Sequence, residues 1–232
     1  MKKQVAILGL GRFGVGLANT LLGMGYDVLA MDVDEKRVQA IAPTITRAVQ
    51  ADGTDEAVLR ELGVDKFDVA IVAMGSDIEN SVMSTILLRK MGVRYVVARA
   101  ENELHGSILD KIGADKVVYP EREMGTRVAH GLMLTQVLDY MPLAAAYGMA
   151  KLSPPNSFIG RTLSELGLGR EGKWGIAVLI IQREREIIVT PDRMEVVRAD
   201  DTLVVSGNDG KIEQMLTEAR KMKREEEEEE EE

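Results

Sequence analysis

Apolar and polar positions alternate in blocks along residues 4–119. Short apolar runs predict six strands, at residues 4–8, 27–31, 46–51, 68–73, 95–98 and 116–119. The stretches between them predict helices at residues 15–24, 34–42, 55–62, 77–91 and 103–112. The run at 68–73 is apolar almost throughout, which is typical of a parallel strand covered on both faces. This alternation predicts an α/β fold with a Rossmann-like, doubly wound parallel sheet.

The pattern changes after Pro120. Apolar residues at spacings of three and four predict one long helix over about 121–140. Two roles are open for this helix. It packs on the sheet of its own domain, or it is a crossover helix that links the domains and contacts a second subunit.

A smaller unit follows the proline-rich turn at 153–156. Its pattern predicts a short helix within 159–167, strands at 175–182, 186–189 and 202–206, and a closing helix at 209–222. The chain then consists of a Rossmann-type nucleotide-binding domain at 1–139, an α+β subdomain at 140–217 and a charged tail at 218–232. Because the subdomain can bury only a small core, we expect it to pack against a partner.

Charge and composition narrow the classes of function. The last eight residues are all glutamate and carry most of the net charge of −9, so we expect a disordered tail that serves solubility or binds a partner. Neither half has the basic excess that nucleic-acid binding requires. The absence of cysteine excludes disulfides and cysteine nucleophiles. No apolar run approaches the roughly 20 residues of a membrane span, which indicates a soluble protein.

A glycine-rich loop, Gly-Leu-Gly-Arg-Phe-Gly at 9–14, follows the first strand and opens the first helix. Gly9 permits the tight turn, Gly11 lets the backbone approach a phosphate, and Gly14 lets the helix pack closely on the sheet. The helix N-terminus offers unpaired N–H groups and a positive dipole end to an anion. The loop therefore predicts a site for nucleotide phosphates, and the alternative is that the glycines serve packing only.

Two charged residues indicate which nucleotide binds. Asp32 ends the second strand, where a carboxylate accepts hydrogen bonds from ribose hydroxyls and repels the 2′-phosphate of NADP. Arg12 lies inside the glycine loop and is either a solvated surface charge or a guanidinium that binds terminal phosphates. In the second case it favours ATP or ADP, which place more phosphate charge there than NAD does.

The ends of the later strands point into the same cleft, because ligands bind outside the carboxyl ends of a doubly wound sheet. Asp52 can accept from an adenine amino group, Gly75 and Ser76 can lie close to the ribose, and Arg99 can reach phosphate. Each is equally open to being an ordinary loop residue. The predicted nucleotide-binding set is Gly9, Gly11, Arg12, Phe13, Gly14, Asp32, Asp52, Gly75, Ser76 and Arg99.

Catalytic candidates are scarce in this sequence. Its two histidines, His105 and His130, lie within predicted helices and are expected to be structural. A dehydrogenase needs a proton donor beside its substrate, and the second unit has no histidine and no evident acid–base pair. We therefore expect a protein that is not an enzyme. The alternative is an NAD(H)-dependent oxidoreductase or an NAD(H)-sensing regulator.

Several segments together resemble a known family. The run Val-Ala-Ile-Leu-Gly-Leu-Gly-Arg-Phe-Gly at 5–14, Asp32, Ile-Gly-Ala-Asp at 112–115 and Pro-Glu-Arg-Glu-Met-Gly at 120–125 are similar to the RCK domains of bacterial potassium uptake regulators, the KtrA/TrkA family. The segments 158–166 and 200–207 resemble the C-terminal RCK subdomain (TrkA-C). The likeness covers about residues 1–217 and leaves out the glutamate tail.

This resemblance implies a regulatory subunit on the inner face of the cell membrane. Such proteins form a cytoplasmic octameric ring of dimers, dock on a membrane potassium transporter subunit of the KtrB or TrkH type, and gate it. ATP and ADP favour different shapes of the ring, and ATP activates. Some relatives also bind cyclic di-AMP between paired C-terminal subdomains, for which the motif is too loose to assign residues.

The resemblance also implies roles for individual residues. Arg12 would contact phosphates, Asp32 the ribose, and Asp52 the adenine end. Glu121, which follows the sixth strand, would lie near a divalent cation, Mg²⁺ or Ca²⁺, at the γ-phosphate where subunits meet.

Overall fold

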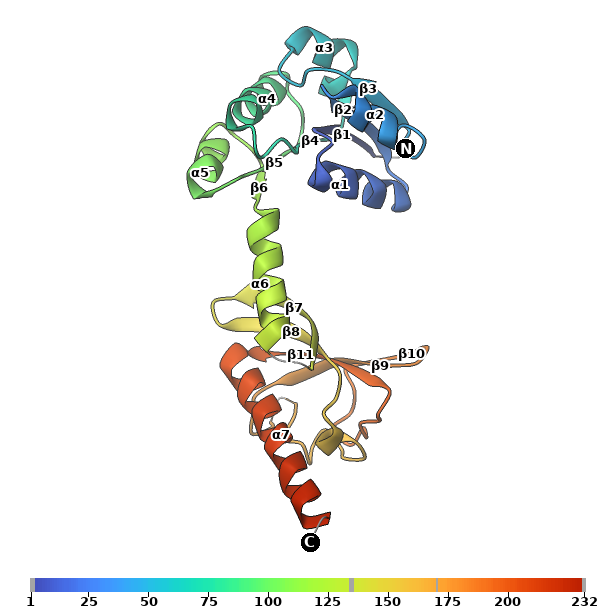
Figure 1. Cartoon of the computed structure of the whole chain (residues 1–232), viewed down its shortest axis with the longest axis vertical. Helices are drawn as coiled ribbons and strands as arrows, with labels where there is room; N and C mark the ends of the chain where they lie inside the picture. Colours follow the sequence, from blue (N-terminus) through green and yellow to red (C-terminus); the bar gives the residue numbers. More distant parts are fainter. Residues whose placement is uncertain (1–2, 134–135, 170, 231–232) are drawn as a thin grey trace. The chain divides into compact units, whose positions relative to one another are not determined.

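The computed structural model describes residues 3–133, 136–169 and 171–230, and it divides the chain into two compact units. Unit 1 is Met1–Arg122 and unit 2 is Glu123–Glu232 (Figure 1). Helix α6 (Pro120–Met133) contains the division between them. None of the helices in these described ranges is long and apolar enough to cross a membrane.

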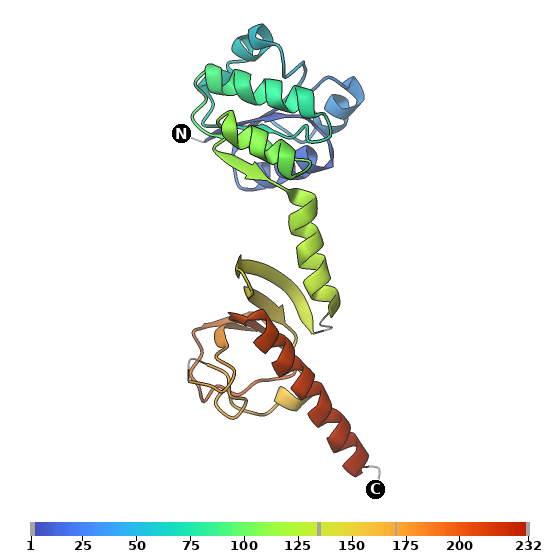
Figure 2. The same cartoon turned by 90° about the vertical axis from the view of Figure 1, so that its left-hand side faces the viewer.

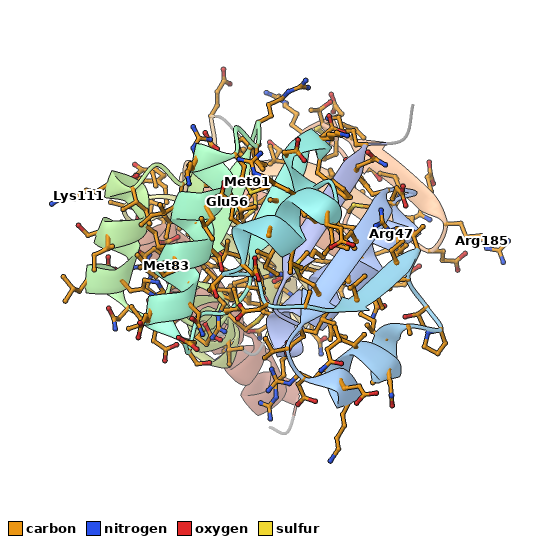
Figure 3. The ribbon with its side chains drawn as sticks, turned by 90° about the horizontal axis from the view of Figure 1, so that it is seen from above. Arg47, Glu56, Met83, Met91, Lys111 and Arg185 are labelled. Carbon is orange, nitrogen blue, oxygen red and sulfur yellow. The ribbon has the colours of Figure 1, made fainter. Side chains whose placement is uncertain are left out.

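Unit 1 is built on six parallel strands in the order β3-β2-β1-β4-β5-β6. They are β1 (Gln4–Leu8), β2 (Asp27–Asp32), β3 (Arg47–Gln50), β4 (Val69–Val72), β5 (Val96–Arg99) and β6 (Lys116–Val118). This is the strand order of the dinucleotide-binding folds, and the predicted fold class is confirmed. Figure 3 shows Arg47 of β3 and Lys111 of α5 near opposite margins of the unit, as that order requires.

Helices cover both faces of this sheet. They are α1 (Arg12–Gly23), α2 (Glu35–Ile41), α3 (Glu56–Glu61), α4 (Ile78–Lys90) and α5 (Glu103–Lys111). Alternate residues of β1 enter different cores, with Val5 and Ile7 in one and Ala6 and Leu8 in the other. Since both sets are buried, β1 needs apolar residues at each of positions 5–8, which explains its continuous apolar run there. Helices α4 and α5 lie side by side (Figure 2).

Unit 2 contains a five-stranded antiparallel sheet in the order β10-β9-β11-β8-β7. Its elements are β7 (Val137–Ala144), β8 (Tyr147–Leu152), β9 (Ala177–Arg183), β10 (Glu186–Val189), β11 (Asp201–Asn208), the short 3₁₀ helix η2 (Asn156–Phe158) and the helix α7 (Asp209–Glu230). Helix α7 packs on β11 and η2. The only tryptophan of the chain, Trp174, is buried in this core.

The long helix predicted over about 121–140 is wrong in its second half. Helix α6 ends at Met133, residues 134–135 lie outside the described part, and β7 begins at Val137. Val137 and Tyr140 are buried in the core of unit 2. Their spacing of three fits a helix as well as a bulged strand, so local periodicity cannot separate the two. The partner strand β8 was not predicted.

Two further expectations fail in unit 2. Residues 159–167 form turns and not a helix, because Gly160 and Gly167 adopt positive φ angles and Thr162 bridges to Val196. Helix α7 continues to Glu230, where a disordered tail was predicted. Glutamate is a good helix former, and extending an existing helix requires no new nucleation.

Candidate functional site

A cleft of about 490 Å³ lies at the carboxyl ends of the parallel strands of unit 1. This edge includes the β1–β4 boundary, where the strand order reverses and doubly wound folds bind their ligands. The volume lies in the range of small-molecule sites. The predicted residues that line the cleft are Gly9, Gly11, Arg12, Phe13, Asp32, Asp52, Ser76, Arg99 and Glu121.

The first and last glycines of the loop hold the backbone in place. Gly9 has a φ of +103°, and its amide donates to the Met31 carbonyl over 2.8 Å. A Cβ at Gly9 would lie 2.7 Å from Cγ of Met74. Gly14 does not line the cleft, but a Cβ there would overlap the Gly9 carbonyl oxygen. Gly14 therefore permits close packing of α1 on the loop.

The N-terminus of α1 is open toward the cleft. Its N-cap is Gly11, which offers no side chain to the first-turn N–H groups, and the first turn has no acidic residue. A Cβ at Gly11 would meet nothing within 4 Å. By contrast, α2, α3, α4 and α5 each begin at a side chain that accepts from a first-turn amide, namely Asp34, Asp55, Asp77 and Asn102. The first-turn N–H groups of α1 therefore have no side-chain acceptor, an arrangement that can receive an anion.

Asp32 lies beneath the glycine loop with only 5% of its side chain exposed. Its Oδ2 accepts from the Leu10 amide over 2.7 Å, and its Oδ1 accepts from the Asp34 amide over 2.9 Å. The guanidinium of Arg37 also reaches Oδ2, over 3.3 Å. These bonds fix the carboxylate at the edge of the cleft.

The loop after β3 is fixed by two hydroxyl groups. Asp52 accepts from the amide and the hydroxyl of Thr54, over 2.8 and 2.7 Å. The carbonyl of Gly53 accepts from the hydroxyl of Ser84, which is fully buried on α4, over 2.9 Å. Ser84 therefore holds the segment that carries Asp52, and nothing in the sequence pattern indicated this contact.

Arg99 and Glu121 form an ion pair at the cleft, with Nη2 of Arg99 2.6 Å from Oε1 of Glu121. The arginine side chain is 17% exposed and the glutamate side chain 68%. Gly75 lies directly against the guanidinium, since a Cβ there would be 2.8 Å from the arginine Cζ. Gly75 itself does not line the cleft, whereas Ser76 does.

The described residues do not form a metal site on their own. No group of three or more His, Asp or Glu that could hold an ion occurs among them. Glu121, the residue predicted to lie near a cation, is instead paired with Arg99. A single carboxylate that already binds an arginine does not fit a resident divalent cation.

The histidines do not contribute to the cleft lining in the described part of the chain. His105 is buried on α5, and its Nδ1 accepts from the Glu101 amide over 3.2 Å. Burial lowers the pKa of His105, and the nearby charge of Glu101 opposes this shift. The side chain of His130 lies outside the described residues.

Sequence reasoning missed part of the lining. Most of the missed residues lie in the last two positions of a strand or within three residues after it, and that position could have identified them. Arg37 and Asn80 lie on helices and gave no signal. Arg12 is exposed and, unlike Arg37 and Arg99, forms no ion pair with a described residue. The additional lining residues are Leu8, Met31, Val33, Arg37, Ala51, Gly53, Ala73, Met74, Asp77, Asn80 and Glu101.

Unit 2 has a cleft of its own, of about 400 Å³. Its lining combines apolar side chains with Ser164, Glu171 and Arg193. The most strongly paired charges of the unit lie elsewhere, where Arg183 contacts Asp201 and Glu195.

Comparison with known proteins assigns both units to families. Residues 5–120 match the TrkA-N domain, and residues 150–219 match the TrkA-C domain. The chain is 40% identical to Ktr system potassium uptake protein C of Bacillus subtilis (strain 168) over 208 residues, which cover 90% of this chain and 93% of that protein. It is 35% identical to Ktr system potassium uptake protein A of Vibrio alginolyticus over 92% of this chain and 96% of that protein.

Solved structures agree in fold. The GsuK RCK domain aligns with a TM-score of 0.65 and 19% identity, covering 93% of this chain and 48% of that one. A GsuK channel bound to NAD aligns with a TM-score of 0.64 and 18% identity, covering 91% of this chain and 38% of that one. At such identity the likeness concerns the fold alone. Because the two domain matches and the Ktr relatives span most of the chain, it belongs to the Ktr/Trk family of potassium uptake proteins, which are RCK-domain regulatory subunits and not enzymes.

Proposed function

We propose that this chain binds ATP and ADP in the cleft of unit 1 and thereby gates a membrane potassium transporter. The observation that carries the proposal is the uncapped N-terminus of α1, with Arg12 beside it and the Asp32 carboxylate below. Phosphates would accept from the first-turn amides, and Asp32 would accept from ribose hydroxyls. The relatives in potassium uptake systems support the regulatory part.

The choice between nucleotides rests on Arg12. A GsuK channel bound to NAD and GsuK bound to ADP have this fold, so both ligand classes are precedents. Arg12 has no ion pair with a described residue and is free to bind a terminal phosphate. ATP differs from ADP by one charged phosphate, which this guanidinium can sense. An NAD(H)-sensing regulator remains the second candidate.

Gating requires that a nucleotide binds two shapes of the assembly with unequal affinity. We propose that the chain forms a ring of dimers, an octamer, on the cytoplasmic face of the membrane, against a KtrB- or TrkH-like subunit. We also propose that cyclic di-AMP binds between two paired copies of unit 2.

The direct test is calorimetric titration of ATP, ADP and NAD into wild-type protein and Asp32→Asn. We expect the variant to bind adenine nucleotides about tenfold or more weakly, because it loses charge-assisted hydrogen bonds to the ribose. Asp27→Asn is the matched control, since Asp27 lies at the opposite end of the same strand. Equal nucleotide affinity in Asp32→Asn and wild type would contradict the placement of the ribose. Oxidation of NADH by the purified protein would favour an oxidoreductase instead.

A further inference from the structure

The Arg99–Glu121 ion pair leaves part of the buried guanidinium without an acceptor among the described residues. Nη2 of Arg99 donates to Glu121, but Nε of Arg99 is buried and has no hydrogen-bond partner among the described residues. A buried N–H without an acceptor is costly, and a guanidinium is best satisfied by two oxygens that accept from its fork. The single contact with Glu121 leaves that fork incomplete.

The surroundings keep Arg99 at the cleft. Gly75 provides the space for its guanidinium, since any side chain at that position would meet the guanidinium at 2.8–2.9 Å. Arg99 lines the same cleft as the open start of α1. A phosphate in the cleft would offer several oxygens to the arginine fork, and would compete with the one carboxylate oxygen that now accepts from it.

Glu121 is the more exposed partner of the pair. It is largely exposed and lies in the first turn of α6, whereas Arg99 ends a central β-strand. When Arg99 binds another acceptor, Glu121 is released to water at little desolvation cost. Opening the pair therefore removes one contact that holds α6, the helix within which the two units divide.

We infer that the Arg99–Glu121 pair is a latch that nucleotide phosphate opens: Arg99 exchanges the Glu121 carboxylate for a phosphate, and the start of α6 is released. This inference rests on the proposed binding of adenine nucleotides in the cleft. It assigns Glu121 the role of a competitor for Arg99 in the nucleotide-free state, which differs from the role of a cation ligand. The latch couples phosphate binding to α6 without a metal ion.

The test is calorimetric titration of ATP, ADP and adenosine in the presence of EDTA. Glu121→Gln removes the competitor, so we expect it to bind ATP and ADP three- to tenfold more tightly than wild type, with adenosine unchanged. Arg99→Gln should bind ATP and ADP more weakly. In the Arg99→Gln background, Glu121→Gln should have no further effect, because the latch is already absent.

Glu103→Gln is the matched control. Glu103 on α5 pairs with Arg122, which is next to Glu121 on α6. Glu103 does not line the cleft, so Glu103→Gln should leave the affinities for ATP, ADP and adenosine unchanged. Arg99→Lys keeps the charge but not the fork, and checks that a loss of binding in Arg99→Gln is not a loss of folding. It should retain intermediate affinity for ATP.

Each of four results would overturn the latch. If Glu121→Gln binds ATP no more tightly than wild type in EDTA, Glu121 does not compete with phosphate for Arg99. An equal gain from Glu121→Gln in the Arg99→Gln background would show a general charge effect. A loss of ATP affinity in Glu121→Gln that occurs only with Mg²⁺ would identify Glu121 as a cation ligand. Wild-type protein that binds neither ATP nor ADP would instead refute the proposed function, and the latch with it.

Discussion

The two units differ in whether their main polar groups have hydrogen-bonding partners inside the fold. Unit 1 leaves the start of α1 uncapped and Arg12 without an ion pair among the described residues, both at one cleft. Unit 2 encloses its main charge cluster: Arg183 contacts both oxygens of the buried Asp201 over 2.8 and 2.9 Å, and also Glu195. Both units contain a buried carboxylate, yet only that of Asp32 lies at a cleft.

The difference shows which polar groups indicate a site. A buried carboxylate with all its partners inside the fold, such as Asp201, contributes to stability and offers nothing to a ligand. Donors left unsatisfied at the carboxyl edge of a parallel sheet, as at the start of α1, are available to a ligand. We therefore expect variants at Asp201 in unit 2 to lose stability, and variants at the start of α1 in unit 1 to lose nucleotide affinity.

The largest expected effect is loss of stability in unit 2. Asp201→Asn removes one of the two carboxylates that contact the buried guanidinium of Arg183, leaving only Glu195, and should cost about 3–5 kcal/mol. Fluorescence of Trp174 during urea unfolding measures this, because the only tryptophan lies in that core. Asp200→Asn, at the exposed neighbour, should change stability by less than about 0.5 kcal/mol. A loss below 1 kcal/mol in Asp201→Asn would show that the cluster is not structural.

The second effect is loss of binding without loss of stability in unit 1. Gly11→Asp would cap α1 as Asp34 caps α2, and its side chain has room. The new carboxylate would occupy the amides and repel phosphate, so nucleotide affinity should fall about tenfold to a hundredfold. Thermal stability should be unchanged or slightly higher. Gly11→Asn caps without charge and should give a smaller loss; unchanged ATP affinity in both variants would contradict phosphate binding at α1.

The third effect applies the same chemistry to a helix away from the cleft. Asp55 caps α3 by accepting from the Ala57 and Val58 amides, and it does not line the cleft. Asp55→Ala should cost about 1 kcal/mol and leave nucleotide affinity unchanged. Amide hydrogen exchange of α3 reports the first quantity and calorimetry the second. A loss of nucleotide affinity in Asp55→Ala would contradict the expectation that only the uncapped start of α1, and not the capped start of α3, affects nucleotide binding.

The smallest effect is the acid dependence of unit 2. Burial alone would raise the pKa of Asp201, but hydrogen bonds from Arg183 and the Arg198 amide lower it below its ordinary value of 3.8. Because the pKa of Asp201 is lower in the folded than in the unfolded protein, its ionised carboxylate stabilises the folded state at pH values above the unfolded pKa. This stabilisation is lost as the pH falls below about 3.8. Asp201→Asn should show a shallower loss of stability between pH 5 and pH 3. An identical slope in wild type and variant would refute the assignment.

The sheet of unit 1 could be predicted because its apolar runs are short, continuous and bounded by turns, as in 68–73. In unit 2 the strands predicted at 175–182, 186–189 and 202–206 correspond to β9, β10 and β11, but the spacing of apolar residues in β7 imitates a helix. Val137 and Tyr140 belong to β7 through pairing with β8, and such pairing is set by tertiary contacts and not by the local pattern.

The site was predictable where topology determines position. Residues at strand ends, such as Asp32 and Asp52, reach the cleft because parallel strands end at one edge. Partnerships between distant residues were not predictable. The contact of Ser84 with Gly53 and the pairing of Arg99 with Glu121 depend on how helices dock, which the sequence pattern leaves open.

If unit 1 senses the terminal phosphate of an adenine nucleotide through Arg12, removing this guanidinium should abolish the preference between ATP and ADP. Calorimetric titration of ATP and ADP into wild type and Arg12→Ala measures that preference. Wild type should distinguish the two nucleotides, and Arg12→Ala should bind them with nearly equal affinity. An ATP-to-ADP affinity ratio that is unchanged in Arg12→Ala would contradict it.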